Sequence, residues 1–276
     1  MIRTLSDHAI LDWRTIMRII LSPAKKMRID TDIILPATKP EFLKEASQVL
    51  VYLQSLDFDS AKKLWACSDK LARENYERLS CTYLSDIASL TPAVLAYDGI
   101  AFQYMAPEVF EENYYPYVQE HLRILSGMYG CLRALDGVVP YRLEMQAKAK
   151  IGGKKNLYDY WGRKLYDAVV DESHVILNLA SKEYSKCIEK YLKTEDHYVT
   201  CIFGEYSDSE NTKIVQKGVY AKMARGDMVR YMAENQIEEL SEIKAYDRLG
   251  FRFSEEESDA NNYVFLREGN AVKAKH

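Results

Sequence analysis

The hydrophobic and polar positions along this 276-residue chain follow two different periods. Short continuous apolar runs predict buried strands at residues 18–22, 174–181 and 198–206. Two further short runs, at 250–258 and 262–268, predict a closing hairpin. Apolar residues that recur every three or four positions predict helices over the following segments: 39–56, 68–79, 156–170, 182–192 and 220–237.

The predicted strands and helices alternate along the chain without a regular period. The sequence contains no internal repeat and no proline- or serine-rich linker that would divide it. Each strand and helix must bury its apolar face against another element. The alternation therefore predicts one compact α+β (mixed α/β) domain with a mixed, mostly covered sheet.

The first sixteen residues differ from the rest of the chain. They precede a second methionine, Met17, and the first convincing strand. We therefore expect a poorly ordered N-terminal extension over 1–16, followed by a single domain over 17–276. Asp7 and Asp12 interrupt the apolar patch of the extension, which argues against a secretory signal, and no uncharged apolar stretch reaches about 18 residues. The sequence predicts a soluble, cytoplasmic protein.

Cysteine and histidine show no spacing that is typical of a metal or redox site. The five cysteines and five histidines are scattered, without a C-x-x-C pair or an H-E-x-x-H helix. The sequence also lacks a phosphate-binding loop and a dinucleotide fingerprint. We therefore expect free thiols, no dedicated metal site and no bound cofactor.

Positive charge is concentrated in two segments, although the formal net charge is -4. Residues 121–186 carry eleven Lys and Arg against seven Asp and Glu, and residues 213–230 carry five against one. If both segments line one face, they form a positive surface on an acidic protein. They could equally be the solvated faces of separate elements.

Several short motifs combine cations with other polar groups. "VPYRLEM" (139–145) places Arg142 and Glu144 two positions apart, where a strand would turn them to one face as an ion pair or a site wall. "YAKMARG" (220–226) places Lys222 and Arg225 on one side of a helix, which suits an anion or a solvated helix face.

The glycine-containing stretch "LSGMYGCLRAL" (125–135) has two interpretations. A hairpin between two helices, with Gly127 and Gly130 at its tip, would expose backbone N–H groups that bind phosphate oxygens, as in a helix-hairpin-helix element. Arg123 and Arg133 flank the stretch and would add charge. The alternative is a simple glycine turn between buried segments.

A series of blocks along residues 17–268 resembles the YaaA family (UPF0246, DUF328) of bacterial peroxide-stress proteins. The blocks occur in the order of the family. One departure is Lys26, which stands where the family's "SPAKT" phrase has threonine. The blocks are "LSPAKKM" (21–27), "SDKLA" (68–72), "AYDGIAFQYM" (96–105), "HLRILSGMYGCLRALDGVVPYRLEM" (121–145), "LYDYWG" (157–162), "ILNLASKEY" (176–184), "YAKMARG" (220–226) and "GFRFSEEES" (250–258).

The resemblance implies a single-domain fold with a positively charged cleft and a helix-hairpin-helix-like element. It also implies DNA binding and a part in the response to hydrogen peroxide, by limiting unincorporated iron. In α/β sheets ligands dock beyond the carboxyl ends of strands. Ser22 and Lys25 follow such a strand. Together with Arg142, Lys222 and Arg225, Lys25 is expected to converge on one anionic ligand.

Three functions remain open at this stage. The first is a DNA-binding stress protein without sequence preference, which phosphate contacts would explain. The second is an enzyme acting on a phosphate-bearing or nucleotide-like molecule, in a cleft that includes Asn178 and Tyr184, with Glu144 or Asp98 as general base. The third is direct handling of iron. A closed pocket would favour the small molecule and an open groove would favour DNA, while the oligomeric state is left undetermined.

Overall fold

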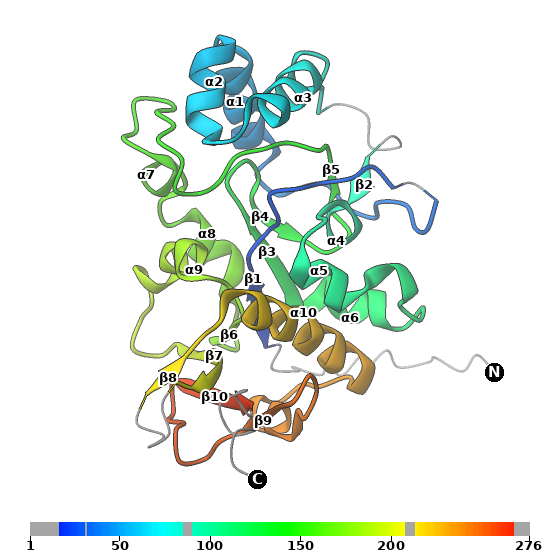
Figure 1. Cartoon of the computed structure of the whole chain (residues 1–276), viewed down its shortest axis with the longest axis vertical. Helices are drawn as coiled ribbons and strands as arrows, with labels where there is room; N and C mark the ends of the chain where they lie inside the picture. The colour runs from blue at the N-terminus through cyan, green and yellow to red at the C-terminus, as the bar shows by residue number, and fades with distance from the viewer. Residues whose placement is uncertain (1–16, 31, 85–89, 208–212, 268–276) are drawn as a thin grey trace, which may run out of the picture.

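The computed structural model describes residues 17–30, 32–84, 90–207 and 213–267. The predicted poorly ordered extension over 1–16 lies outside the described residues. The described chain forms one mixed α/β unit, in agreement with the fold class predicted from the sequence (Figure 1).

One mixed sheet runs through the molecule. Its strands are β1 (Arg18–Leu21), β3 (Leu122–Ser126), β4 (Gly130–Arg133), β6 (Val175–Asn178), β7 (His197–Tyr206), β8 (Ile214–Val215), β9 (Phe251–Phe253) and β10 (Asn262–Arg267). The order is β4-β3-β1-β6-β7-β10-β9, with β8 paired to β7. The strands β3, β1, β6, β7 and β10 run parallel, and β4, β8 and β9 pair antiparallel to them. A separate two-stranded sheet joins β2 (Thr91–Pro92) to β5 (Gly137–Val138).

Helices cover the sheet on both sides and extend beyond one end (Figure 1). Their bounds are α1 Leu43–Gln54, α2 Phe58–Trp65, α3 Asp69–Ser80, α4 Ala93–Ala96, α5 Ile100–Met105, α6 Tyr114–His121, α7 Leu157–Trp161, α8 Lys164–Val169, α9 Lys182–Glu189 and α10 Gly218–Asn235, with short 3-10 turns η2 (Pro107–Val109) and η3 (Leu240–Ala245). Helices α8 and α9 lie on one side, and α5, α6 and α10 lie on the other. Helices α1 to α3 form a separate group at one end (Figure 1).

The strand β1 lies inside the sheet and is covered on both faces. Ile19, Ile20 and Leu21 are all fully buried, as successive apolar residues of a parallel strand must be. The chain leaves β1, returns as β3 on one side of it, and later returns as β6 on the other side. This reversal makes the carboxyl end of β1 a topological switch point, where open α/β sheets bind ligands.

Residues 125–135 form a β-hairpin, so the prediction of a helix-hairpin-helix tip is wrong here. Strands β3 and β4 pair antiparallel across the turn, and only α6 precedes them directly. Gly127 is buried against the carbonyl of Leu143, which an added Cβ would approach to 2.5 Å. Gly130 has a φ of +76° and packs on the ring of Trp161. Both glycines allow close packing in the core, so they do not present N–H groups to a phosphate.

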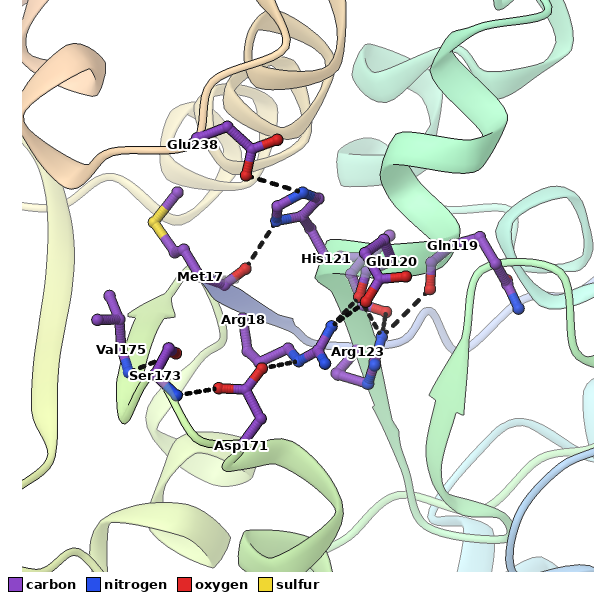
Figure 2. Close-up of polar contacts among 11 residues, drawn as sticks. Met17, Arg18, Gln119, Glu120, His121, Arg123, Asp171, Ser173, Val175 and Glu238 are labelled. Carbon is purple, nitrogen blue, oxygen red and sulfur yellow. Dashed lines mark hydrogen bonds and ion pairs between the residues drawn. The ribbon is translucent and has the colours of Figure 1, made fainter. Parts of the chain in front are cut away.

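The two arginines beside this hairpin lie in different surroundings. Arg123 is buried, and its Nη1 donates to the carbonyls of Glu120 at 2.9 Å and Leu122 at 3.0 Å, at the end of α6 (Figure 2). Arg133 is exposed at the end of β4. A second correction concerns the helix predicted over 156–170, which Gly162 divides into α7 and α8 by adopting a φ of +54°.

Candidate functional site

A cavity of about 360 Å³ lies beyond the carboxyl ends of β1 and β6. Five segments that are far apart in the sequence form its walls: the loop 21–26 after β1, the segment 98–102, the segment 141–144, the start of α9 and one side of α10. The residues proposed from the sequence that line it are Ser22, Lys25, Asp98, Arg142, Glu144, Tyr184, Lys222 and Arg225. The structure therefore brings the four cations Lys25, Arg142, Lys222 and Arg225 together around one cavity.

Serine 22 fixes the loop after β1 to the start of α9. Its Oγ accepts a hydrogen bond from the backbone N–H of Ser181 at 2.8 Å and lies 3.1 Å from the Oγ of Ser181. The backbone N–H of Leu179 donates to the carbonyl of Ile20 at 2.9 Å. Because Ser181 precedes the first turn of α9 and lines the cavity, the positive end of the helix dipole lies at the cavity wall.

Two carboxylates in the cavity are already paired with cations. Lys25 Nζ lies 2.8 Å from Glu144 Oε2, and Arg142 Nη2 lies 3.7 Å from Glu144 Oε1. Lys26 Nζ lies 2.5 Å from Asp98 Oδ2. The hydrogen bond from Lys26 keeps the pKa of Asp98 below its usual range. A carboxylate with a lowered pKa is a weak proton acceptor, which argues against the general-base role proposed for Asp98 from the sequence.

Two of the cavity cations, Lys222 and Arg225, form no ion pair with a carboxylate of the described residues. Lys222 is exposed to solvent, whereas Arg225 is largely buried. Arg225 makes no hydrogen bond or ion pair with any residue that the structure describes, and its Nε is buried without a partner. Burial lowers the pKa of Arg225. The Nε of Arg142 is also buried, and it has no hydrogen-bond partner within the described part of the chain. These two guanidinium groups leave hydrogen-bonding capacity at the cavity wall.

Glutamate 183 is a cavity residue that the sequence analysis missed. It lies in the first turn of α9, and its Oε1 accepts a hydrogen bond from the backbone N–H of Gln146 at 3.1 Å. Burial raises the pKa of Glu183, and the nearby negative charge of Glu144 raises it further. The signal was available in "ASKEY", because this segment follows a buried strand just as "SPAKK" follows β1.

Two other predicted residues have roles that the structure now shows. Asn178 lies at the end of β6 outside the cavity lining, where its Oδ1 accepts from the N–H of Ala180 at 2.9 Å and its Nδ2 donates to Thr200 Oγ1 at 3.2 Å. Asn178 therefore shapes the turn that leads to α9. Tyr184 does line the cavity, and burial raises the pKa of its hydroxyl, which stays neutral.

The described residues contain neither a cluster of metal-binding side chains nor a membrane-spanning helix. No three side chains from His, Cys, Asp and Glu gather there in an arrangement that would hold a metal ion. None of the helices in this part of the chain is both long enough and apolar enough to cross a membrane.

Comparison with known proteins identifies relatives along nearly the whole domain. The family model described as "Peroxide stress protein YaaA" matches residues 17–257. A UPF0246 protein of Agathobacter rectalis is 55% identical over 251 residues, covering 91% of this chain and 99% of the relative. The corresponding proteins of Desulfitobacterium hafniense and Lachnoclostridium phytofermentans are 53% and 51% identical, each over 91% of this chain and over 98% and 96% of their own lengths. The chain therefore belongs to the YaaA (UPF0246) family of peroxide stress proteins.

Proposed function

We propose that this peroxide stress protein binds a phosphate-bearing small molecule in the cavity beyond β1 and β6. The observation that carries the proposal is Arg225, a largely buried cation without a carboxylate partner among the described residues. Burying an unpaired charge costs several kcal/mol, and an anion that fills the cavity would offset this cost. A guanidinium group also matches a phosphate with two parallel hydrogen bonds.

The composition of the cavity wall supports a small molecule rather than a free inorganic anion. Its cations outnumber its carboxylates, which are Asp98, Glu144 and Glu183, and apolar groups such as Leu21, Ile100 and Phe102 complete the lining. A few convergent polar groups in a mostly apolar hollow are typical of small-molecule sites. A volume of about 360 Å³ lies within the usual range for such sites.

Calorimetric titration with inorganic phosphate tests the proposal. We expect Arg225→Gln to weaken phosphate binding at least about tenfold, because a charge-assisted hydrogen bond contributes roughly 1.5–3 kcal/mol. Arg133→Gln is the matched control, since Arg133 is exposed and lies outside the cavity. Equal phosphate affinity in the wild type and Arg225→Gln would refute the proposal, as would a complete lack of phosphate binding by the wild type.

DNA is a second candidate ligand, which one observation outside the cavity favours. Lys148, Lys150, Lys154 and Lys155 are exposed on one loop, and none of them pairs with a carboxylate in the part of the chain that the structure describes. Gly152 and Gly153, with φ values of +56° and +76°, form a turn in this loop. Unpaired lysines on a projecting loop suit the phosphate backbone of a duplex, which is contacted without regard to sequence.

Salt dependence separates the DNA candidate from the small-molecule proposal. Replacing the four loop lysines by glutamine should reduce the slope of log affinity for duplex DNA against log salt by about 3–4, if each contacts a phosphate. Phosphate binding in the cavity should not change. A slope equal to that of the wild type would remove the loop from the DNA candidate.

Enzymatic turnover and control of iron are two extensions of the proposal. Of the three cavity carboxyls, Glu183 is best suited to proton transfer, because its pKa is raised toward neutrality while Glu144 and Asp98 are ion-paired. The expectations of a cytosolic location and of a limit on unincorporated iron stay predictions. If iron is handled directly, titration with Fe(II) should show saturable binding, and its absence would leave only an indirect effect.

A further inference from the structure

A second cavity, of about 550 Å³, adjoins the first one. Helices α1 and α2 form one wall and the segment 144–148 forms the other. The aromatic and aliphatic side chains in its lining are those of Tyr52, Leu56, Leu64 and Trp65. No residue proposed from the sequence as an anion ligand lies in its wall, which combines aromatic and aliphatic side chains with two lysines.

The two cavities share one residue, Glu144. It appears in the lining of both, and its carboxylate is held on the first side by Lys25 at 2.8 Å and by Arg142 at 3.7 Å. Gln146, in the wall of the second cavity, donates its backbone N–H to Glu183 in the first. Glu144 and the hydrogen bond between Gln146 and Glu183 therefore lie where the two cavities meet.

The lining of the second cavity indicates what kind of group it takes. The rings of Tyr52 and Trp65 and the side chains of Leu56 and Leu64 offer flat, apolar contact. The indole N–H of Trp65 is buried and has no hydrogen-bond partner among the described residues, although an unpaired buried donor is costly. The side chains of Tyr52, Leu56 and Leu64 are partly exposed, so they form the surface that a flat group in the cavity would contact.

Two cations lie in the wall of the second cavity. Lys63 in α2 and Lys148 in the opposite segment are both exposed, and neither forms an ion pair with a described residue. They favour an organic group that carries acceptor atoms over a pure hydrocarbon chain. An aromatic heterocycle meets all these conditions, because it is flat, it stacks on rings, and its edge carries hydrogen-bond acceptors.

We propose that the second cavity receives the base of a nucleotide whose phosphate lies beside Arg225 in the first cavity. This inference rests on the proposed function, since it assigns the organic part of the phosphate-bearing ligand. Glu144 divides the two parts and contacts the sugar that joins them. The first cavity thus supplies charge and the second supplies selectivity for the base.

Titration of the wild-type protein with a graded series of ligands tests the inference. The probes are inorganic phosphate, ribose 5-phosphate, adenosine 5′-monophosphate and octyl phosphate. We expect the nucleotide to bind at least about tenfold more tightly than ribose 5-phosphate, in line with the usual contribution of base stacking. Equal affinities of these two would overturn the inference and leave phosphate binding intact. A gain for octyl phosphate without a gain for the nucleotide would also overturn it, in favour of an alkyl group.

A substitution in the exposed wall localises the effect. Ser60→Trp places a large ring at an exposed position of α2 that lines the second cavity, and Val51→Trp places the same ring at an exposed position of α1 outside it. Ser60→Trp should reduce nucleotide affinity to that of ribose 5-phosphate without changing phosphate affinity, and Val51→Trp should change neither. Equal nucleotide affinity in both variants would contradict the inference, whereas loss of phosphate binding by the wild type would refute the proposed function itself.

Discussion

Arg18 at the amino ends of the parallel strands and Arg225 beyond their carboxyl ends differ in how their charges are paired. At the amino ends, Arg18 contacts the carboxylates of Asp171 at 2.9 Å and Glu120 at 3.1 Å, and Arg123 donates to three backbone carbonyls (Figure 2). His121 lies in the same cluster, and burial lowers its pKa, which keeps it neutral. At the carboxyl ends, Arg225 has no partner in the described part of the chain.

This difference separates charges that are paired within the fold from the charge to which we assign a ligand under the proposed function. The cluster in Figure 2 joins β1, α6, β3 and the loop before β6, and each buried polar group there has an acceptor or a counter-ion. A fully paired buried network holds elements together. An unpaired buried cation is destabilising by itself, and the proposed anionic ligand would offset this cost. Whether a buried cation has a counter-ion or an acceptor is therefore a better guide to its role here than the number of cations in the region.

The largest effect that we predict concerns what holds Arg225 in place. Helices α10 and α5 cross so closely that a Cβ on Gly226 would lie 1.7 Å from the carbonyl oxygen of Ala101. Gly226→Ala should therefore force the helices apart and lower the free energy of unfolding by about 3 kcal/mol or more, as overpacking does at its upper end. Urea denaturation measures this change.

A matched glycine in the same helix provides the control. Gly218 begins α10, and an added Cβ there meets nothing within 4 Å. Gly218→Ala should leave stability within about 1 kcal/mol of the wild type. If both variants unfolded at the same urea concentration, backbone contact between α10 and α5 would not be what positions the arginine.

A pair of arginine substitutions tests the comparison directly. Arg18→Gln removes the partner of two carboxylates, so we expect a loss of about 2 kcal/mol in the free energy of unfolding. Arg225→Gln removes a buried charge without a partner, so the ligand-free protein should be equally stable or more stable. Chemical denaturation without added phosphate measures both. A large destabilisation by Arg225→Gln would show that this arginine is structural after all.

The sequence predicted the fold class and many strands because burial requires apolar runs at those positions. "RIIL" and "VILN" could be recognised without any tertiary information, since both faces of these strands are covered. The hairpin at 125–135 was misjudged because glycine permits either an exposed tip or close packing, and only the neighbours Leu143 and Trp161 decide between them. The sequence pattern contains no record of such neighbours.

The candidate site was predictable where a strand end could be recognised. Ser22 and Lys25 follow β1 and were found in this way, and Lys222 and Arg225 were found from helical spacing. The second cavity was missed because it depends on how α1 and α2 pack against the segment 144–148, which no local pattern specifies. The sequence also could not predict that Arg225 lacks a partner among the described residues, because ion pairing depends on every residue that surrounds the guanidinium group in the fold.

The smallest predicted effect concerns Glu183, a cavity carboxyl whose pKa is raised by burial. A carboxyl with a raised pKa in the folded state favours folding below its ordinary titration range and loses this contribution as the pH rises through the folded pKa. Glu183→Gln keeps an oxygen that can accept the Gln146 N–H but carries no charge. The variant should therefore be slightly more stable than the wild type at pH 7, by less than about 1 kcal/mol, and the difference should vanish near pH 4.

The Glu183→Gln variant should also bind sulfate more tightly than the wild type at pH 7, because one negative charge has left the cavity. The charge of sulfate is constant between pH 4 and pH 7. Thermal unfolding with and without sulfate at both pH values measures these changes. A variant with unchanged sulfate affinity at pH 7 would show that Glu183 does not face the bound anion, and the cavity would then bind its ligand on the side of Arg225 alone.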